Sequence, residues 1–250
     1  MEIKDENNDV DLDIWEYEQY VQGMRLAFWR LLDFLLLADE LFPYELELPV
    51  KKPIAAAFEL SDEDLDQARL LAKVTSCFLI GFTAFETLLN AISGVAIYLY
   101  LRQLRSENPI ELTECEFASL LEQREDGKWQ NISVTKKLNS YPELLAKITS
   151  GNWYLDKKGK LYSNFEYCKN KRHSLAHTKA NWNGDNRCTN DIYVELEDLV
   201  ILLWTYTNYL RKVINVSEQC LDAFQVFEKL LEKYNGQILT SYGWFEQSLN

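Results

Sequence analysis

The chain has 250 residues, 26% of them charged, with a formal net charge of −13 and an isoelectric point near 4.7. An apolar content of 47% predicts a globular protein with a substantial core rather than a disordered chain. The negative charge excludes a general nucleic-acid coat protein or a binder of anionic membranes, because the mean field repels phosphate, but it leaves room for a local basic site.

Helical spacing of apolar residues dominates the chain, so the predicted class is mainly α. A serine cap followed by acids at Ser61–Asp64 marks the start of the longest predicted helix. A period-two alternation over 191–196 leaves a short strand as the alternative there. The predicted helices are 11–42, 61–105, 112–125, one opened by Pro142 within the mixed stretch 131–151, 160–178, and 191–234 with a break near 215–217 and a stop at Gly236. The predicted non-helical segments are an acidic tail at 1–10, a proline-rich connection at 43–60, and loops at 152–159 and 181–186.

The cysteines and the start of the chain indicate a cellular compartment. The five cysteines are scattered, odd in number and form no C-x-x-C pair, which predicts reduced thiols rather than a disulfide framework or a zinc cluster. The first residues are polar and acidic and carry no signal-peptide pattern. We therefore expect a cytoplasmic protein.

One segment of the chain is long and apolar enough to span a bilayer. Val74–Leu101 covers 28 residues with a single charge, Glu86. A carboxylate near a bilayer centre costs a few kcal/mol, and no second segment resembles a span. The central helix of a soluble bundle, without membrane contact, is therefore the preferred interpretation. The polar residues of this segment recur at helical steps and form one stripe, made of Ser76, Thr83, Glu86, Thr87, Asn90 and Ser93.

Glu86 and Asn90 stand four residues apart and share one face of this helix. A structural interpretation makes them a capped buried pair or a solvated seam of the bundle. A functional interpretation places them in a cleft, where they orient an arginine or a histidine from another helix.

The only two histidines of the chain, His173 and His177, lie in a basic segment. Residues 156–179 contain seven lysines and arginines and two acids, a formal charge of +5 within an acidic protein. Such a segment attracts a phosphodiester over a Debye length of about 8 Å. A solvated basic helix end, favoured by the helix dipole, explains the same charge without a ligand.

Three uses of the histidines fit this pattern. His173 and His177 share a helical face and would suit a metal, but a zinc site needs a further ligand and the sequence has no H-E-x-x-H motif or nearby cysteine pair. A histidine with a pKa near 6.5 also suits acid–base catalysis beside an arginine that holds a phosphate oxygen. The third use is structural, as a cap of the helix C-terminus or as a side chain packed beneath the following loop.

The phrase Arg172-His-Ser-Leu-Ala-His177 resembles the Arg-x(4–6)-His motif of HEPN domains, the all-α higher-eukaryote and prokaryote nucleotide-binding domains. The polar residue that this family places after the arginine corresponds to His173. Phe85-Glu-Thr-Leu-Leu-Asn90 is similar to a phrase on an earlier helix of many members, whose acid faces the motif. The resemblance covers about 61–235 and implies a helical bundle of HEPN type, with 1–60 as an N-terminal helical extension and 236–250 as a C-terminal tail.

The resemblance implies a metal-independent endoribonuclease of a toxin–antitoxin or phage-defence type, without a cofactor. The RNA 2′-hydroxyl would attack the adjacent phosphorus and leave a 2′,3′-cyclic phosphate. His177 and Arg172 would carry the chemistry, with Glu86 orienting or polarising one of them. Because the family builds its site from two domains, it implies a homodimer, or an antitoxin or defence-system partner protein. Residues expected to bind the RNA substrate are His173, Asn90, Lys169, Lys171 and Lys179.

Two other functions compete with this interpretation. The alternative to the ribonuclease is a non-catalytic helical module that binds a nucleotide or a protein through the same cleft. A metal-dependent enzyme using the histidine pair is the third hypothesis.

Overall fold

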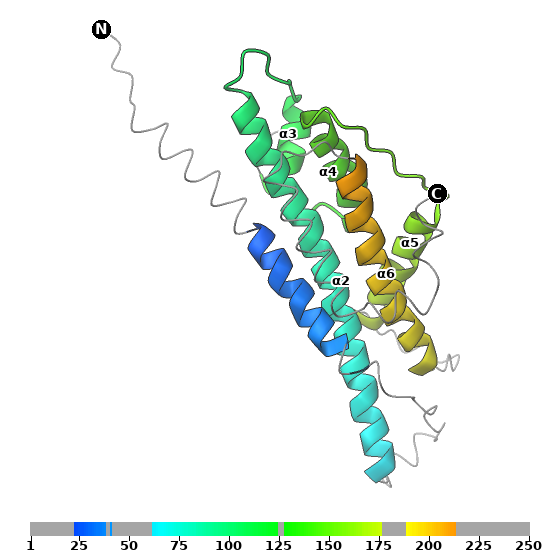
Figure 1. Cartoon of the computed structure of the whole chain (residues 1–250). Coiled ribbons are helices and arrows are strands. Elements are labelled where there is room, and N and C mark those ends of the chain that lie inside the picture. The colour runs from blue at the N-terminus through cyan, green and yellow to red at the C-terminus, as the bar shows by residue number, and fades with distance from the viewer. Residues whose placement is uncertain (1–22, 39–40, 42–61, 125–127, 177–188, 214–250) are drawn as a thin grey trace. The chain divides into compact units, whose positions relative to one another are not determined.

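The structure is a computed structural model that describes residues 23–38, 41, 62–124, 128–176 and 189–213. These residues are mainly helical, which confirms the predicted class (Figure 1). The described part contains no strand, only an isolated antiparallel bridge between Gln123 and Trp129. The helices are an N-terminal helix over 23–38, α2 (Asp62–Gln103), α3 (Glu114–Leu120), α4 (Val134–Ile148), α5 (Lys160–Ala176) and α6 (Thr189–Val213).

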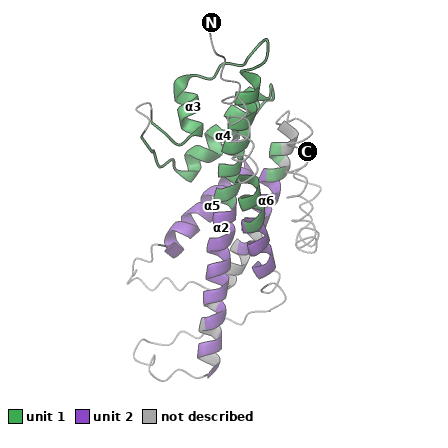
Figure 2. Ribbon diagram, turned by 90° about the vertical axis from the view of Figure 1, so that its left-hand side faces the viewer, with its two compact units in different colours: residues 1–29, 85–155, 207–227 green, residues 30–84, 156–206, 228–250 purple. Residues whose placement is uncertain are grey.

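Two compact units share these helices, and each is built from segments that are distant in sequence (Figure 2). Unit 1 comprises residues 1–29, 85–155 and 207–227, and unit 2 comprises residues 30–84, 156–206 and 228–250. Helix α2 therefore contributes its first half to unit 2 and its second half to unit 1. Helix α6 likewise contributes to both units.

In the core of unit 2, three helices pack closely together at Gly81. A Cβ placed on Gly81 of α2 would lie 2.5 Å from Leu199 Cδ2 of α6 and 2.6 Å from the ring of Phe34 on the N-terminal helix. Only a glycine permits three helices to approach this closely. Helix α5 joins the same unit through Asn164, whose side-chain amide donates to the Asp198 carbonyl of α6 at 2.9 Å. The buried side chains of unit 2 include Phe34, Leu35, Cys77, Phe78, Phe82, Phe165, Cys168, Leu196, Leu199, Leu203 and Tyr206.

In unit 1 the second half of α2 packs against α3 and α4. Ser93 on α2 donates its hydroxyl to the Leu120 carbonyl at 2.6 Å, which satisfies an end carbonyl of α3. Gln103 donates to the Ile148 carbonyl of α4 at 2.6 Å in the same way. The buried side chains of unit 1 include Phe85, Leu88, Leu89, Ile92, Val95, Leu120, Ile132, Leu138, Tyr141, Leu144, Leu145, Ile148 and Leu210.

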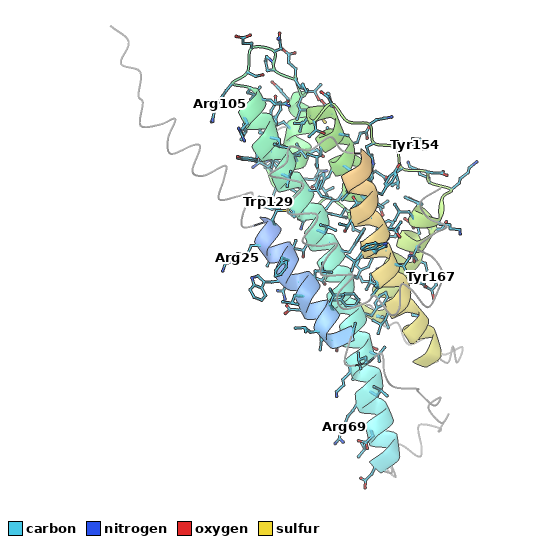
Figure 3. All side chains as sticks on the ribbon, in the orientation of Figure 1. Arg25, Arg69, Arg105, Trp129, Tyr154 and Tyr167 are labelled. Carbon is cyan, nitrogen blue, oxygen red and sulfur yellow. The ribbon has the colours of Figure 1, made fainter. Side chains whose placement is uncertain are left out.

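The segment predicted as a loop over 152–159 is non-helical, as expected, and within unit 1 it is attached to α6. The Tyr209 hydroxyl of α6 donates to the Tyr154 carbonyl, and the ring centres of Trp153 and Tyr209 are 4.9 Å apart. The side chains of Tyr154 and Trp129 themselves project from the surface of the unit, as does Tyr167 from unit 2 (Figure 3). Exposed aromatic residues that occur singly are normal on folded proteins, so these three do not by themselves indicate an interface.

Local signals fix where the two short helices of unit 1 begin. Thr113 caps α3, accepting from the Glu116 amide while the Glu116 carboxylate accepts from the Thr113 amide, a reciprocal capping box. Ser133 caps α4 by accepting from the Lys136 amide at 3.3 Å. The helix predicted over 112–125 is confirmed in part, because α3 already ends at Leu120.

Two local predictions are wrong. Pro142 does not open a helix but lies inside α4, where it is buried beside Tyr141. A proline within a helix costs about 3 kcal/mol, but burial of several large apolar side chains on the same face offsets that loss. The short strand considered for 191–196 is also wrong, since these residues belong to α6.

Several predictions fall on residues outside those described. They concern the acidic tail at 1–10, the start of the first helix at 11–22, the connection at 43–60, the loop at 181–186, the continuation of the last helix to 234, the stop at Gly236 and the tail at 236–250.

The long apolar helix meets the length and composition of a membrane span. Within the described residues, Ala72–Gln103 is the one segment that does so. Some 61% of its most apolar window is buried within the protein, and a buried core helix meets the same criteria.

Candidate functional site

Helix α5 carries the described part of the basic motif. Its buried residues, Phe165 and Cys168, fix the face that packs into unit 2. Near the last described turn, Arg172 is partly buried and His173 is exposed. His177 and Lys179 lie outside the described residues. The structure thus places Arg172 and His173 on one helix, as predicted. The pairing of Arg172 with His177 stays a prediction.

The lysines of α5 differ in their surroundings. Lys169 donates to both carboxylate oxygens of Glu166 at 2.6 Å and lies 5.5 Å from the centre of the Phe165 ring. Part of its charge is therefore compensated within the helix. Lys171 is partly buried, and its carbonyl accepts from the Ser174 hydroxyl at 3.0 Å. Lys169 would have to exchange its carboxylate partner to bind a phosphate.

Two titratable groups near the contact of α5 with α6 are perturbed. Burial raises the pKa of the Asp198 carboxyl, whose backbone carbonyl accepts from Asn164. Burial also raises the pKa of Tyr162 on α5, and the Glu166 carboxylate adds to that effect. Both shifts follow from packing, so neither by itself indicates catalysis.

Glu86 and Asn90 belong to unit 1, whereas Arg172 and His173 belong to unit 2. Glu86 is partly buried and Asn90 is exposed. The Asn90 carboxamide oxygen accepts from the Lys137 ammonium at 2.8 Å. Asn90 therefore has a structural partner on α4, and the contact predicted between the Glu86 face and the motif stays a prediction.

The rest of the polar stripe on α2 is divided between solvent and core. Ser76 and Thr83 are exposed, and the Thr83 hydroxyl donates a hydrogen bond to the Leu79 carbonyl one turn earlier, at 2.8 Å. Ser93 is buried and binds the Leu120 carbonyl. These three positions thus favour the structural interpretation of the stripe, a solvated seam closed by a helix cap.

The sequence did not reveal a polar cluster in unit 1. Lys137 of α4 donates to Asn90 and forms an ion pair with Glu122, whose carboxylate also accepts from the Tyr141 hydroxyl at 3.4 Å. Glu122 has a φ of 54°, a left-handed conformation that costs a non-glycine residue about 1 kcal/mol or more. Burial raises the pKa of Tyr141, and the charge of Glu122 raises it further. No local spacing signals this cluster, because its members come from three separate elements.

A second ion pair connects α3 with α4. Lys147 donates to the two carboxylate oxygens of Glu116 at 2.9 and 2.8 Å. This bond, with that from the Thr113 amide, lowers the pKa of the Glu116 carboxyl. Glu116 therefore caps α3 and ties it to α4 at once.

Among the residues that the structure describes, no group of three histidine, cysteine or acidic side chains could hold a metal ion. The hypothesis of a metal-dependent enzyme needs His173, His177 and at least one further ligand. The described residues contain no cluster that supplies such a ligand.

No family model matches the chain, and no curated protein or solved structure matches it. The resemblance to HEPN domains therefore depends on the two sequence phrases alone.

Proposed function

We propose that the protein is a metal-independent endoribonuclease of HEPN type, working in a toxin–antitoxin or phage-defence setting in the cytoplasm. The observation that carries the proposal is the Arg172–His177 motif, which holds both histidines of the chain within its most basic segment. The partial burial of Arg172 supports the proposal, since a guanidinium shielded from water interacts more strongly with developing charge.

In the proposed reaction the RNA 2′-oxygen forms a bond to the adjacent phosphorus and the bond to the 5′-oxygen breaks. His177 accepts the proton of the 2′-hydroxyl and a proton is returned to the leaving 5′-oxygen, so the products are a 2′,3′-cyclic phosphate and a 5′-hydroxyl. Arg172 stabilises the negative charge that develops on the phosphorane oxygens. Glu86 acts as a positioning residue for one of these groups.

The remaining predicted residues would hold the RNA backbone. The exposure of His173 near the end of α5 supports this role. Lys171 and Lys179 would add positive charge, while Lys169 and Asn90 would first have to leave Glu166 and Lys137. One motif per chain calls for a second copy, so we propose a homodimer, or a complex with a partner protein that supplies its own motif.

Digestion of a labelled RNA pool in the presence of EDTA tests the proposal. We expect the wild-type protein to produce fragments ending in 2′,3′-cyclic phosphate and the His177→Ala variant to produce none, with equal melting temperatures. Loss of wild-type cleavage on chelation would assign a metal-dependent enzyme. Cleavage by His177→Ala at the wild-type rate would reject the catalytic assignment.

One observation favours the alternative, a non-catalytic module that binds a nucleotide or a protein. Lys169 and Asn90 already have protein partners, which is typical of residues with structural roles. Binding of RNA without cleavage in the same assay would support this alternative.

A further inference from the structure

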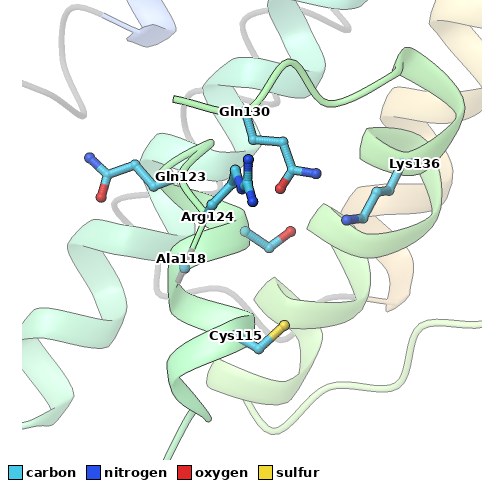
Figure 4. A pocket seen from close by; sticks show the side chains of 7 residues that line it. Cys115, Ala118, Gln123, Arg124, Gln130 and Lys136 are labelled. Carbon is cyan, nitrogen blue, oxygen red and sulfur yellow. The ribbon is translucent and has the colours of Figure 1, made fainter. Parts of the chain in front are cut away.

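Unit 1 contains a pocket between the end of α3, the turn that follows it and the start of α4. Its volume is about 360 Å³, which is within the range of small-molecule sites. Arg124, Gln130 and Lys136 direct their polar ends toward the same space (Figure 4). The described residues that line it are Cys115, Ala118, Ser119, Gln123, Arg124, Gln130 and Lys136.

The charge of this lining is unusual for so acidic a protein. The described lining residues include two cations, Arg124 and Lys136, and two amides, but no carboxylate. The whole chain carries a net charge of −13, so two cations without a carboxylate in the described part of this lining do not follow from composition. Lys136 belongs to the first turn of α4, which contains no acidic residue, so the positive end of the helix dipole adds to the same potential.

Ser119 provides an independent indication of a ligand. Ser119 is one of the residues that line the pocket, and its hydroxyl oxygen is buried and has no hydrogen-bond partner among the residues that the structure describes. A buried hydroxyl without a partner is destabilising, and such groups are uncommon in folded proteins. A polar ligand in the pocket would provide the missing partner.

An adjoining pocket of about 580 Å³ provides room for the rest of such a ligand. It shares Cys115, Ser119 and Lys136 with the first pocket. Its lining includes Trp153 and Leu144, which suit an apolar or aromatic body. It also includes two carboxylates and a second lysine, Glu116, Glu143 and Lys147, so the excess of cations belongs to the first pocket and not to this one.

We infer that this pair of pockets binds a small phosphorylated molecule, with its phosphate between Arg124 and Lys136 and its organic body toward Trp153. Arginine binds phosphate through two parallel hydrogen bonds, and lysine adds a point charge. The Ser119 hydroxyl and the Gln130 amide donate to the remaining phosphate oxygens. This inference goes beyond the proposed function, because the pocket lies in unit 1 and the ribonuclease motif lies on α5 in unit 2.

Calorimetric titration with phenyl phosphate, a phosphate with an aromatic body, tests the inference at constant ionic strength. We expect phenyl phosphate to bind, inorganic phosphate to compete with it and phenol not to bind. Arg124→Gln and Lys136→Gln should each weaken binding by about tenfold or more, since each removes a charged hydrogen bond. Lys128→Gln removes the same charge from the same turn but outside the pocket lining, and should change the affinity by less than about twofold.

Two further variants distinguish a built phosphate site from general attraction of anions and from binding at the ribonuclease motif. Ser119→Ala should weaken binding severalfold while leaving the melting temperature of the free protein unchanged or higher, because the hydroxyl has no partner to lose among the described residues. Arg172→Gln should leave phenyl phosphate binding unchanged, whatever it does to RNA cleavage. Failure of the wild-type protein to bind, equal losses in Lys128→Gln and Lys136→Gln, or loss of binding in Arg172→Gln would each overturn the inference.

Discussion

Lys137 of α4 forms an ion pair with Glu122 in the turn after α3, and only 12% and 19% of the two side chains are exposed. The same ammonium also binds the Asn90 carboxamide of α2, so one lysine joins three elements of unit 1. Glu122 has a left-handed backbone conformation at this position. The pair therefore fixes the turn against α4, and the bond to Asn90 connects both to α2.

Breaking this pair should destabilise the protein strongly. Lys137→Met leaves the Glu122 carboxylate largely buried without its cation, which costs about 3 kcal/mol or more. The neighbouring Lys136→Met removes an exposed lysine from the same helix and should change the unfolding free energy by less than about 0.5 kcal/mol. Urea denaturation followed by circular dichroism measures both. In the double variant Glu122→Gln/Lys137→Met the loss should be smaller than the sum of the single losses. Equal effects of Lys136→Met and Lys137→Met would show that the pair contributes nothing.

Gly81→Ala should destabilise unit 2 although alanine is the better helix former. The new methyl would lie 2.5–2.6 Å from Leu199 and the Phe34 ring, and overpacking of this kind costs about 1–3 kcal/mol. The helix-propensity gain of about 1 kcal/mol offsets only part of that cost. Gly23→Ala is the matched control, because among the described residues its Cβ would meet the Ala91 Cα alone, at an ordinary 3.7 Å. Thermal melts compare the two, and a melting temperature of Gly81→Ala at or above that of Gly23→Ala would contradict the prediction.

The ionised Glu116 carboxylate should contribute to the free energy of unfolding, and this contribution should be lost in acid. Its pKa in the folded state lies below its usual value of 4.5, so the folded protein binds fewer protons there than the unfolded chain. The stabilisation is present above that usual value and is lost as the pH falls through the lowered pKa. Since the side chains of Glu116 and Lys147 are 31% and 41% exposed, we expect Glu116→Gln to cost only about 0.5 kcal/mol at pH 7 and nothing in strong acid. Denaturant titrations at about pH 7 and about pH 3 test this, with the exposed Glu114→Gln as control; a difference that persists in acid would be inconsistent with it.

The proposed site should show an order of effects on RNA cleavage. Arg172→Ala should lower the rate by about 10² to 10³, because an unpaired developing charge costs about 3–4 kcal/mol. His173→Ala should be milder, since only a polar residue is required there, and Glu86→Gln should fall between the two. Single-turnover rates in EDTA, with a thermal melt of each variant, provide the ranking. If His173→Ala is as severe as His177→Ala while Arg172→Ala is harmless, the histidines act as metal ligands instead.

Helix positions are predictable where several local signals agree. The longest helix, predicted over 61–105, is observed as Asp62–Gln103, because capping residues and a sustained apolar period favour the same structure. Over 191–196 the alternation is too short to decide, and the buried residues Leu196, Leu199, Val200 and Leu203 follow the helical spacing of three and four. The prediction for Pro142 is wrong because its local preference is outweighed by burial of its neighbours in α4.

The candidate site is predictable only as far as its sequence phrases extend. Arg172 and His173 lie on a helix as predicted, but which side chains meet across elements is decided by packing. Lys137 contacts Asn90, which is 47 residues away in sequence, and Glu122, which is 15 residues away. Neither separation carries a recognisable signal, so only the folded structure identifies the partner of Asn90.

The division of each unit into distant segments has a consequence for synthesis on the ribosome. Unit 1 needs residues from 1–29 and from 207–227, and unit 2 needs residues beyond 156 to cover the first half of α2. The apolar face of the first half of α2, with Phe78 and Phe82, is therefore made before α5 and α6, although the N-terminal helix that carries Phe34 is made earlier still. Until α6 has emerged, this part of a nascent chain is open to contacts with other chains, and such transient exposure of apolar surface favours aggregation.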